Sequence, residues 1–226
     1  MHDIICLIPA RSGSKGLKNK NIKPLNKVPL LMYPYKVANK CKFVKDIAVT
    51  SDSKKYLNFF EYKKVFKILR PKKISQSKSI IYDVIIHALL SLQKNYKYIV
   101  LLEPTSPLTS SKEIDKAIKL VKSKKNNISS VVSVVSNHKF LSVFRAKSNK
   151  KTKIKNFNRQ EFNQNEFYFS GNFYVAKIDY LKKIKSFVGK NTHYFPIKDS
   201  MHTDIDDLKD FMIAEMFLQK KLFRFK

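Results

Sequence analysis

The chain has 226 residues, of which 43% are hydrophobic, so it can bury one sizeable core but not two ordinary domains. No segment approaches the roughly 18 apolar residues that a membrane helix needs, and the start of the chain carries no basic leader, so we expect a cytoplasmic protein without a membrane association. Cys6 and Cys41 lie far apart and lack a metal-binding or redox spacing, which fits a reducing compartment.

The chain is strongly basic, with 46 Lys and Arg against 17 Asp and Glu, a formal net charge of +29. Such a charge is typical of proteins that bind nucleic acid, and it also steers any anionic substrate inward. The lysines are, however, spread along the whole chain together with abundant Ile, Asn, Phe and Tyr. We therefore attribute most of the charge to compositional drift and keep nucleic-acid binding as an alternative.

Apolar runs bounded by turn residues alternate with longer amphipathic segments over most of the chain. The runs typical of strands are 4–9, 46–53, 65–71, 96–108, 127–136 and 166–177. The segments with helical spacing are 29–41, 53–64, 79–95, 112–124 and 203–223. Strands separated by helices of this length predict a single α/β domain over 1–226, a Rossmann-like, mostly parallel sheet with helices on both faces. Pro34 should kink or shorten the first helix.

The pattern is interrupted between residues 137 and 164, where the sequence is polar, basic and without periodicity. A structureless stretch of this length inside a compact domain is usually functional, as a lid or an oligomer arm. We expect a small dimerisation arm inserted at about 137–170.

The loop after the first strand, ARSGSKGLKNKNI, combines closely spaced glycines with many cations. In parallel α/β sheets ligands bind outside the carboxyl ends of the strands, so this loop is the expected phosphate site. Gly13 and Gly16 are only three positions apart, which matches neither the dinucleotide fingerprint nor a P-loop. The free backbone N–H groups and the cations Arg11, Lys15 and Lys20 are nevertheless suited to surround a polyphosphate.

Two carboxylates, Asp204 and Asp206, stand in the segment TDIDDLKDF before the last helix. In an extended segment both point to one face while Ile205 turns to the core, and paired carboxylates suit a hard cation such as Mg²⁺. The alternative is that Asp206 or Asp207 merely caps the helix. We favour a Mg²⁺ site at Asp206 and Asp204.

Seven blocks, in order, resemble the acylneuraminate cytidylyltransferase (CMP-sialic acid synthetase) family, in its bacterial nonulosonic acid branch. They are ARSGSKGLKNKNI, VTSDS, ILRP, DVIIHAL, LLEPTSPL, SGNFYV and TDIDDLKDF. The resemblance implies a Mg²⁺-dependent homodimer in which the anomeric hydroxyl of a sugar acid attacks the α-phosphorus of CTP and expels pyrophosphate. It also implies a role in building surface polysaccharides.

The resemblance assigns roles to individual positions of this chain. The implied catalytic cations are Arg11, Lys15 and Lys20. The implied nucleotide-binding residues are Ala10, Gly13, Ser14, Gly16, Asn21 and Arg70. The implied sugar-binding residues are Glu103, Thr105, Ser106, Arg159 and Gln160, the last two in the arm. Several positions depart from the family pattern: Glu103 stands at a usual Gln, Thr109 at a usual Arg, Lys18 at a usual Pro and Ser77 at a usual Asp. A different sugar acid such as Kdo therefore stays an alternative substrate, beside a basic α/β protein that binds nucleic acid.

Overall fold

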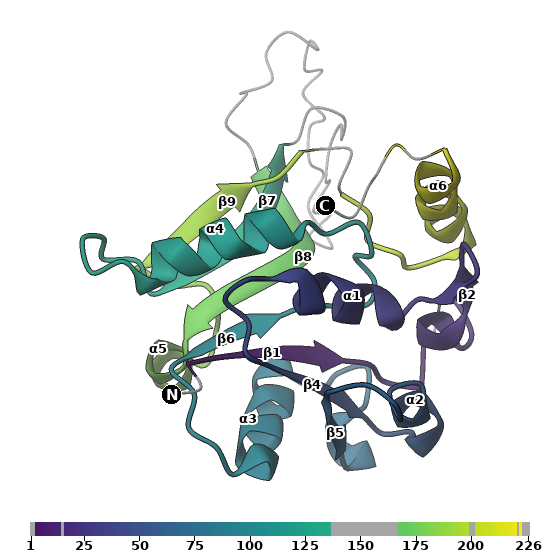
Figure 1. The fold of residues 1–226 in the computed structure, drawn as a ribbon, viewed down its shortest axis with the longest axis horizontal. Coiled ribbons are helices and arrows are strands. Elements are labelled where there is room, and N and C mark those ends of the chain that lie inside the picture. Colours follow the sequence, from purple (N-terminus) through teal and green to yellow (C-terminus); the bar gives the residue numbers. More distant parts are fainter. Residues whose placement is uncertain (1–2, 15, 137–166, 199–201, 221, 223–226) are drawn as a thin grey trace, which may run out of the picture.

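The computed structural model describes residues 3–14, 16–136, 167–198, 202–220 and 222 (Figure 1). Its centre is a seven-stranded sheet in the order β5-β4-β1-β6-β8-β7-β9. The strands are β1 (Ile4–Pro9), β4 (Asp46–Ser51), β5 (Phe66–Leu69), β6 (Tyr98–Leu101), β7 (Ser130–Ser136), β8 (Phe167–Lys177) and β9 (Thr192–Pro196). Only β8 runs antiparallel to its two neighbours, so the expected mostly parallel sheet is confirmed.

Helices cover both faces of the sheet (Figure 1). Along β1 the side chains of Ile4, Cys6 and Ile8 enter one core cluster, and those of Ile5 and Leu7 enter the other. A strand buried on both faces needs an unbroken apolar run, which explains the sequence IICLIP. The first face packs against α1 (Met32–Lys40), α2 (Lys54–Asn58) and α4 (Ser111–Lys122), and the second against α3 (Ile81–Leu92) and α5 (Ile178–Ile184).

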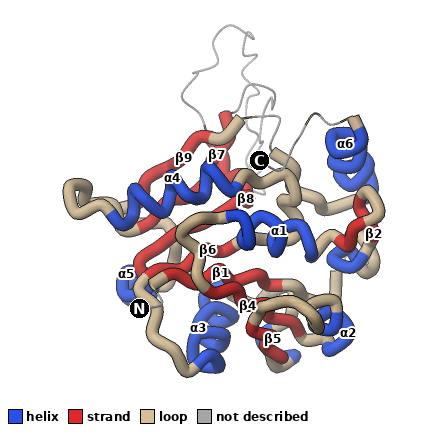
Figure 2. Tube along the Cα trace, in the orientation of Figure 1, coloured by secondary structure: helices blue, strands red, loops and turns tan. Residues whose placement is uncertain are grey.

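The last helix, α6 (Leu208–Gln219), packs away from the main sheet, beside the small hairpin of β2 (Pro24–Leu25) and β3 (Val28–Pro29) (Figure 2). A third core cluster joins Phe211, Ala214 and Leu218 of this helix to Leu25 and Leu30 of the hairpin segment. The hairpin follows the glycine-containing loop, and α6 follows the Asp204–Asp206 segment. This packing therefore holds the loop and the Asp204–Asp206 segment close to each other.

Some elements differ from the expectation in length. α1 begins only at Met32, so Pro34 falls in the first helical turn, where its missing N–H costs no hydrogen bond, and the helix is shortened instead of kinked. α2 ends at Asn58, and the turn that follows buries Phe60 completely against the ring of Tyr35. The sequence patterns also missed α5 and β9, which are short and carry few buried side chains.

The expected arm lies almost wholly outside the described residues. Of the segment 137–170, the structure places 167–170, which belong to β8. β8 departs from regular pairing at Gly171, whose φ of 73° lies in the left-handed region that favours glycine. Ser106 packs against this glycine, with 3.2 Å between its Oγ and the position of an added Cβ. Among the described residues no helix has the length and apolar character needed to cross a membrane.

The order of the strands fixes where a ligand can bind. From β1 the chain builds β4 and β5 on one side and then returns to place β6 on the other side, so the topology switches between β1 and β6. The loops that leave these two strands diverge there and open a crevice at the carboxyl edge of the sheet. The loop after β1 and the turn after β6 are the two that the sequence identified as chemically rich.

Candidate active site

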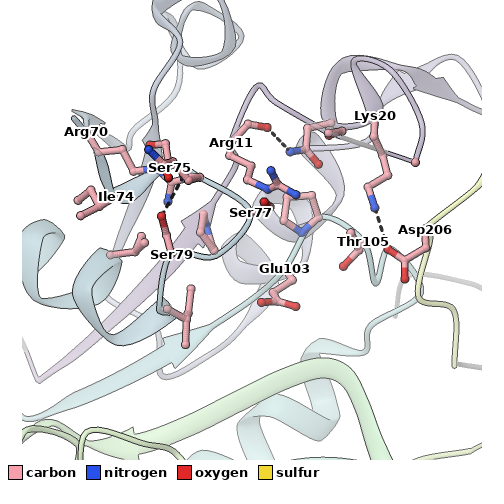
Figure 3. A pocket seen from close by; sticks show the side chains of 18 of the residues that line it. Arg11, Lys20, Arg70, Ile74, Ser75, Ser77, Ser79, Glu103, Thr105 and Asp206 are labelled. Carbon is pink, nitrogen blue, oxygen red and sulfur yellow. Dashed lines mark hydrogen bonds and ion pairs between the residues drawn. The ribbon is translucent and has the colours of Figure 1, made fainter. Parts of the chain in front are cut away.

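A cavity of about 520 Å³ lies at this switch point (Figure 3). Ten of the predicted site residues line it: Arg11, Ser14, Gly16, Lys20, Asn21, Arg70, Glu103, Thr105, Asp204 and Asp206. Figure 3 shows Arg11 and Lys20 reaching toward the space that Glu103 and Asp206 border. The cavity therefore collects side chains from four separate stretches of sequence.

The other predicted site residues are placed differently. Ala10 is buried at the end of β1, Gly13 is exposed on the loop, and Ser106 is buried beneath Gly171, and none of the three lines the cavity. Lys15, Arg159 and Gln160 lie outside the described residues.

Hydrogen bonds to neighbouring segments hold the loop after β1 in place. Ala10 donates its main-chain N–H to the carbonyl of Thr50 at 2.9 Å, which extends the pairing of β1 with β4 by one residue. Asn21 donates its side-chain N–H to the carbonyl of Arg11 at 2.9 Å. The Oδ1 of this buried Asn21 has no hydrogen-bond partner in the described part of the protein, so it is available to a ligand.

Arg70 presents a buried positive charge to the cavity. Its side chain is only 5% exposed, and its Nε finds no acceptor among the described residues. Burial lowers the pKa of Arg70, and nearby Arg11 lowers it further, while the carboxylate of Asp52 raises it. Two guanidinium groups that repel each other beside an unsatisfied donor favour an anion between them.

Lys20 joins the glycine-containing loop to the segment before α6. Its Nζ donates to the carbonyl oxygen of Ile205 and lies 3.2 Å from Oδ1 of Asp206. The lysine side chain is 11% exposed and the aspartate side chain 82% exposed. The ammonium group is therefore largely fixed at the cavity wall, while the second oxygen of Asp206 faces open space.

The structure decides which aspartate caps α6. Asp207 accepts a hydrogen bond from the N–H of Asp210 at 3.0 Å, and Asp210 accepts one from the N–H of Asp207 at 3.1 Å, which completes a capping box. Ile205 is fully buried as expected, and Asp204 and Asp206 line the cavity on either side of it. The helix-cap alternative thus applies to Asp207, and the carboxylate of Asp206 is left free of that role.

Gly16 explains how closely the loop approaches this segment. A Cβ at Gly16 would stand 2.4 Å from the main-chain oxygen of Asp206, whereas a Cβ at Gly13 would meet nothing within 4 Å. We expect Gly16→Ala to cost about 1–3 kcal/mol through this clash, and to lower Tm by several degrees. Gly13→Ala is the matched control and should leave Tm unchanged in a thermal melt. Equal Tm values for the two variants would contradict the close approach.

Glu103, two residues after the end of β6, is a carboxyl group of the cavity with a strongly perturbed pKa. Burial and then the charge of Asp204 raise the pKa of Glu103 to about 7, with Lys20 acting in the opposite direction and Asp206 adding to the rise. Burial and the charge of Asp206 also raise the pKa of Asp204. Three carboxyl groups share one cavity wall, so any cation there would lower their mutual repulsion.

The raised pKa of Glu103 predicts a pH-dependent stability. The folded state holds this proton up to about pH 7, whereas the unfolded chain releases it near pH 4.5, so the stability of the wild type falls as pH rises through that window. Glu103→Gln cannot ionise, and its Tm should therefore gain on the wild type between pH 5 and pH 8. We expect the free energy of unfolding of the variant to gain about 1–3 kcal/mol on that of the wild type over this range, after allowing for partial exposure of the carboxyl group. The measurement is a melt in EDTA, and a Tm difference independent of pH would refute the assignment.

One wall of the cavity, the loop between β5 and α3, was assigned no role from the sequence, although Ser77 in it was noted as a departure from the family pattern. Ser75, Gln76, Ser77 and Ser79 of this loop line the cavity beside Arg70. The segment SQSKS carried the signal, since hydroxyl and amide groups cluster after a strand, but short polar stretches are common in loops and this one has no distinctive spacing.

The cavity's donor set suits Mg²⁺ better than a metal that needs a full protein cage. No group of three His, Cys, Asp or Glu able to hold a metal occurs in the part of the chain that the structure covers. Asp204 and Asp206 supply hard oxygen donors on one wall, and Lys20 occupies only one oxygen of Asp206. Mg²⁺ commonly binds through one or two carboxylates and takes its remaining ligands from water and phosphate oxygens.

A doubly wound sheet with a cationic crevice at its switch point is the architecture of nucleotide-binding α/β proteins. Within that class, the chain belongs to the cytidylyltransferase family, whose sequence profile matches residues 5–225.

The chain is similar to the N-acylneuraminate cytidylyltransferase of Escherichia coli O18:K1:H7, with 33% identity over 96% of this chain and 52% of the relative. It thus spans about half the length of that relative. It is 31% identical to the CMP-N,N'-diacetyllegionaminic acid synthase of Campylobacter jejuni, over 98% of this chain and 97% of the relative. Among solved structures, CMP:2-keto-3-deoxy-manno-octonic acid synthetase complexed with CTP matches with a TM-score of 0.71 at 11% identity, over 97% of this chain and 99% of that one. This last match concerns the fold.

Proposed function

We propose that the protein is a Mg²⁺-dependent cytidylyltransferase that couples CTP to a nonulosonic, sialic acid-like sugar acid and releases pyrophosphate. The observation that carries the proposal is the arrangement of charge in the cavity: Arg11, Lys20 and Arg70 line it together with the carboxylates Asp204 and Asp206. Cations neutralise a polyphosphate, and carboxylates in the same cavity suit the metal that such a nucleotide carries.

The chain's own residues have distinct tasks in this reaction. Arg11 and the orphaned Nε of Arg70 hold phosphate oxygens, and Lys20 places its ammonium group where negative charge grows as pyrophosphate leaves. The new bond joins the anomeric oxygen of the sugar to the α-phosphorus, the bond from that phosphorus to the bridging oxygen breaks, and the hydroxyl proton passes to a carboxylate or to water. Bound Mg²⁺, held by Asp204 and Asp206, would supply further neutralisation of the phosphate charge.

The sugar acid would occupy the end of the cavity near Glu103 and Thr105. The two curated relatives reported above are named for N-acylneuraminate and N,N'-diacetyllegionaminic acid, which supports a nonulosonic acid over Kdo. Glu103 offers acceptor oxygens, or a donor once it holds its proton, to a hydroxyl or amide of the sugar.

We also propose a homodimer in the cytoplasm that serves surface-polysaccharide synthesis. Exposed aromatic rings on β8 and β9 support the dimer: Phe167, Phe169 and Tyr194 are each about half exposed, and the tilted rings of Phe169 and Tyr194 lie with their centroids 6.3 Å apart. Apolar surface of this kind marks interfaces in proteins. Sedimentation of the purified chain at the mass of one protomer across the micromolar range would refute the dimer.

The experiment that tests the function is a pyrophosphate-release assay with Mg²⁺. Each of the four ribonucleoside triphosphates is offered with N-acetylneuraminic, legionaminic and pseudaminic acid and with Kdo. We expect release with CTP and one of the nonulosonic acids. Release with Kdo alone would establish the alternative substrate, and no release in a folded protein would refute the proposal.

A further inference from the structure

Asp52 follows β4 directly and does not line the cavity, yet both oxygens of its carboxylate hold the glycine-containing loop. Oδ1 accepts a hydrogen bond from the main-chain N–H of Ser12 at 2.8 Å, and Oδ2 accepts one from the Ser12 hydroxyl at 2.8 Å. Hydrogen bonds to an ionised acceptor are the stronger kind. One side chain thus clamps the residue that follows Arg11.

This clamp begins where the strand pairing ends. The last backbone bond between the two segments joins the N–H of Ala10 to the carbonyl of Thr50, and the carboxylate of Asp52 then takes the next available donor, at Ser12. On the other side, Asn21 holds the carbonyl of Arg11. The backbone of Arg11 is therefore fixed at its own carbonyl and at the next residue, which limits where its guanidinium group can point.

The same carboxylate acts on Arg70, the second guanidinium of the cavity. The N–H of Arg70 donates to the carbonyl of Ser51 at 2.8 Å, so Arg70 joins the end of β4 next to Asp52. The negative charge of Asp52 favours the charged form of Arg70, while Arg11 disfavours it. Asp52 thereby offsets the repulsion between two arginines that must both face an anion before it arrives.

We infer that Asp52 is a positioning residue for the phosphate chain of the nucleotide, acting through Ser12 and Arg70 without touching the substrate. The inference rests on the proposed function in that the phosphate chain belongs to CTP. It predicts that Asp52 contributes to the binding of phosphates and not to the binding of the nucleoside, because it holds the residue next to Arg11 in place and its negative charge favours the charged form of Arg70.

A purely structural role is the competing explanation, and the chain offers a matched control for it. Asp115 makes the same kind of clamp elsewhere: its two oxygens accept from the main-chain N–H of Lys42 at 3.0 and 3.1 Å. Asp115 stands in α4 and does not line the cavity. Loss of either clamp should lower Tm, but only loss of the Asp52 clamp should affect phosphate binding.

The test compares Asp52→Ala, Asp52→Asn, Ser12→Ala and Asp115→Ala with the wild type. Calorimetric titration gives the affinities for tripolyphosphate and CTP at fixed Mg²⁺, and NMR titration gives the affinity for cytidine. We expect Asp52→Ala to weaken tripolyphosphate and CTP binding on the order of tenfold or more. Ser12→Ala, which keeps the main-chain hydrogen bond, should lose about threefold, and Asp52→Asn should fall between them. Cytidine binding should not change, and Asp115→Ala should bind all three ligands as the wild type does.

Three results would overturn the inference: Asp52 variants that bind tripolyphosphate normally, losses of equal size for cytidine and tripolyphosphate, or a comparable loss in Asp115→Ala. A wild type that binds no tripolyphosphate would overturn it as well. If Asp52→Ala does not fold, Asp52→Asn and Ser12→Ala carry the same test. Failure of the proposed function looks different, since the wild type would then bind tripolyphosphate and still release no pyrophosphate with any sugar acid.

Discussion

Asp206→Asn should reduce the turnover of CTP on the order of a hundredfold or more, while Tm stays close to that of the wild type. The carboxylate of Asp206 lines the cavity, and among the described residues it is bound through one oxygen, by Lys20. In the proposed function its removal takes away charge that would hold Mg²⁺ beside the phosphates, and the expected loss has the size seen when a preorganised electrostatic group is removed. The remaining activity should no longer respond to Mg²⁺ concentration as the wild type does.

Asp207→Ala is the control for this prediction, because Asp207 provides the cap of α6. Loss of an N-cap costs about 1 kcal/mol, which corresponds to a fall of roughly 2–4 °C in Tm for a chain of this size. Turnover and its Mg²⁺ dependence should remain. The measurements are steady-state rates over a range of Mg²⁺ concentrations and a thermal melt for each variant. An Asp206→Asn protein that stays active and melts lower would reverse the two roles.

Lys20→Met should likewise reduce kcat on the order of a hundredfold. The lysine is buried, and its Nζ is held by the carbonyl of Ile205 and by Asp206, so its charge is already in place before the substrate binds. Methionine fills a similar volume without the charge, which keeps the packing while removing the stabilisation of growing phosphate charge.

Lys18→Met tests whether the position of the charge matters, since Lys18 is exposed on the same loop and does not line the cavity. This variant loses the same formal charge and should keep kcat within about twofold. Rates at saturating CTP for both variants and for the wild type decide the question. Equal losses would mean that the general field of a +29 chain, and not Lys20, supports the reaction.

The fold was predictable from the sequence where a strand is buried on both faces of the sheet, because such a strand needs an unbroken apolar run. IICLIP and the other central strands gave this signal, and α4 showed a clear apolar stripe. β9 did not, because its residues are partly exposed or exposed, and it is placed by parallel pairing with β7 and by the packing of Phe195 against the core. Such pairing between distant segments has no local pattern.

The candidate site was predictable where residues suited to binding phosphate or metal stand together in a recognisable motif. The loop after β1 and the Asp204–Asp206 segment stood out by residue type, and the topology brings both to one cavity. Asp52 and the serines of the 75–79 loop were assigned no role, although Ser77 was noted as a departure from the family pattern. Asp52 acts through a hydrogen-bond clamp to Ser12, 40 positions away in sequence, and only a three-dimensional structure shows it.

Transfer of the cytidylyl group is tested by identifying the product with ³¹P NMR in a reaction of CTP, Mg²⁺ and the sugar acid that supports pyrophosphate release. We expect the α-phosphorus resonance of CTP to be replaced by that of a phosphodiester to the sugar, together with an equal amount of pyrophosphate. Conversion to free CMP, or a CTP spectrum that does not change with time, would contradict transfer of the cytidylyl group to a sugar acid in this cavity.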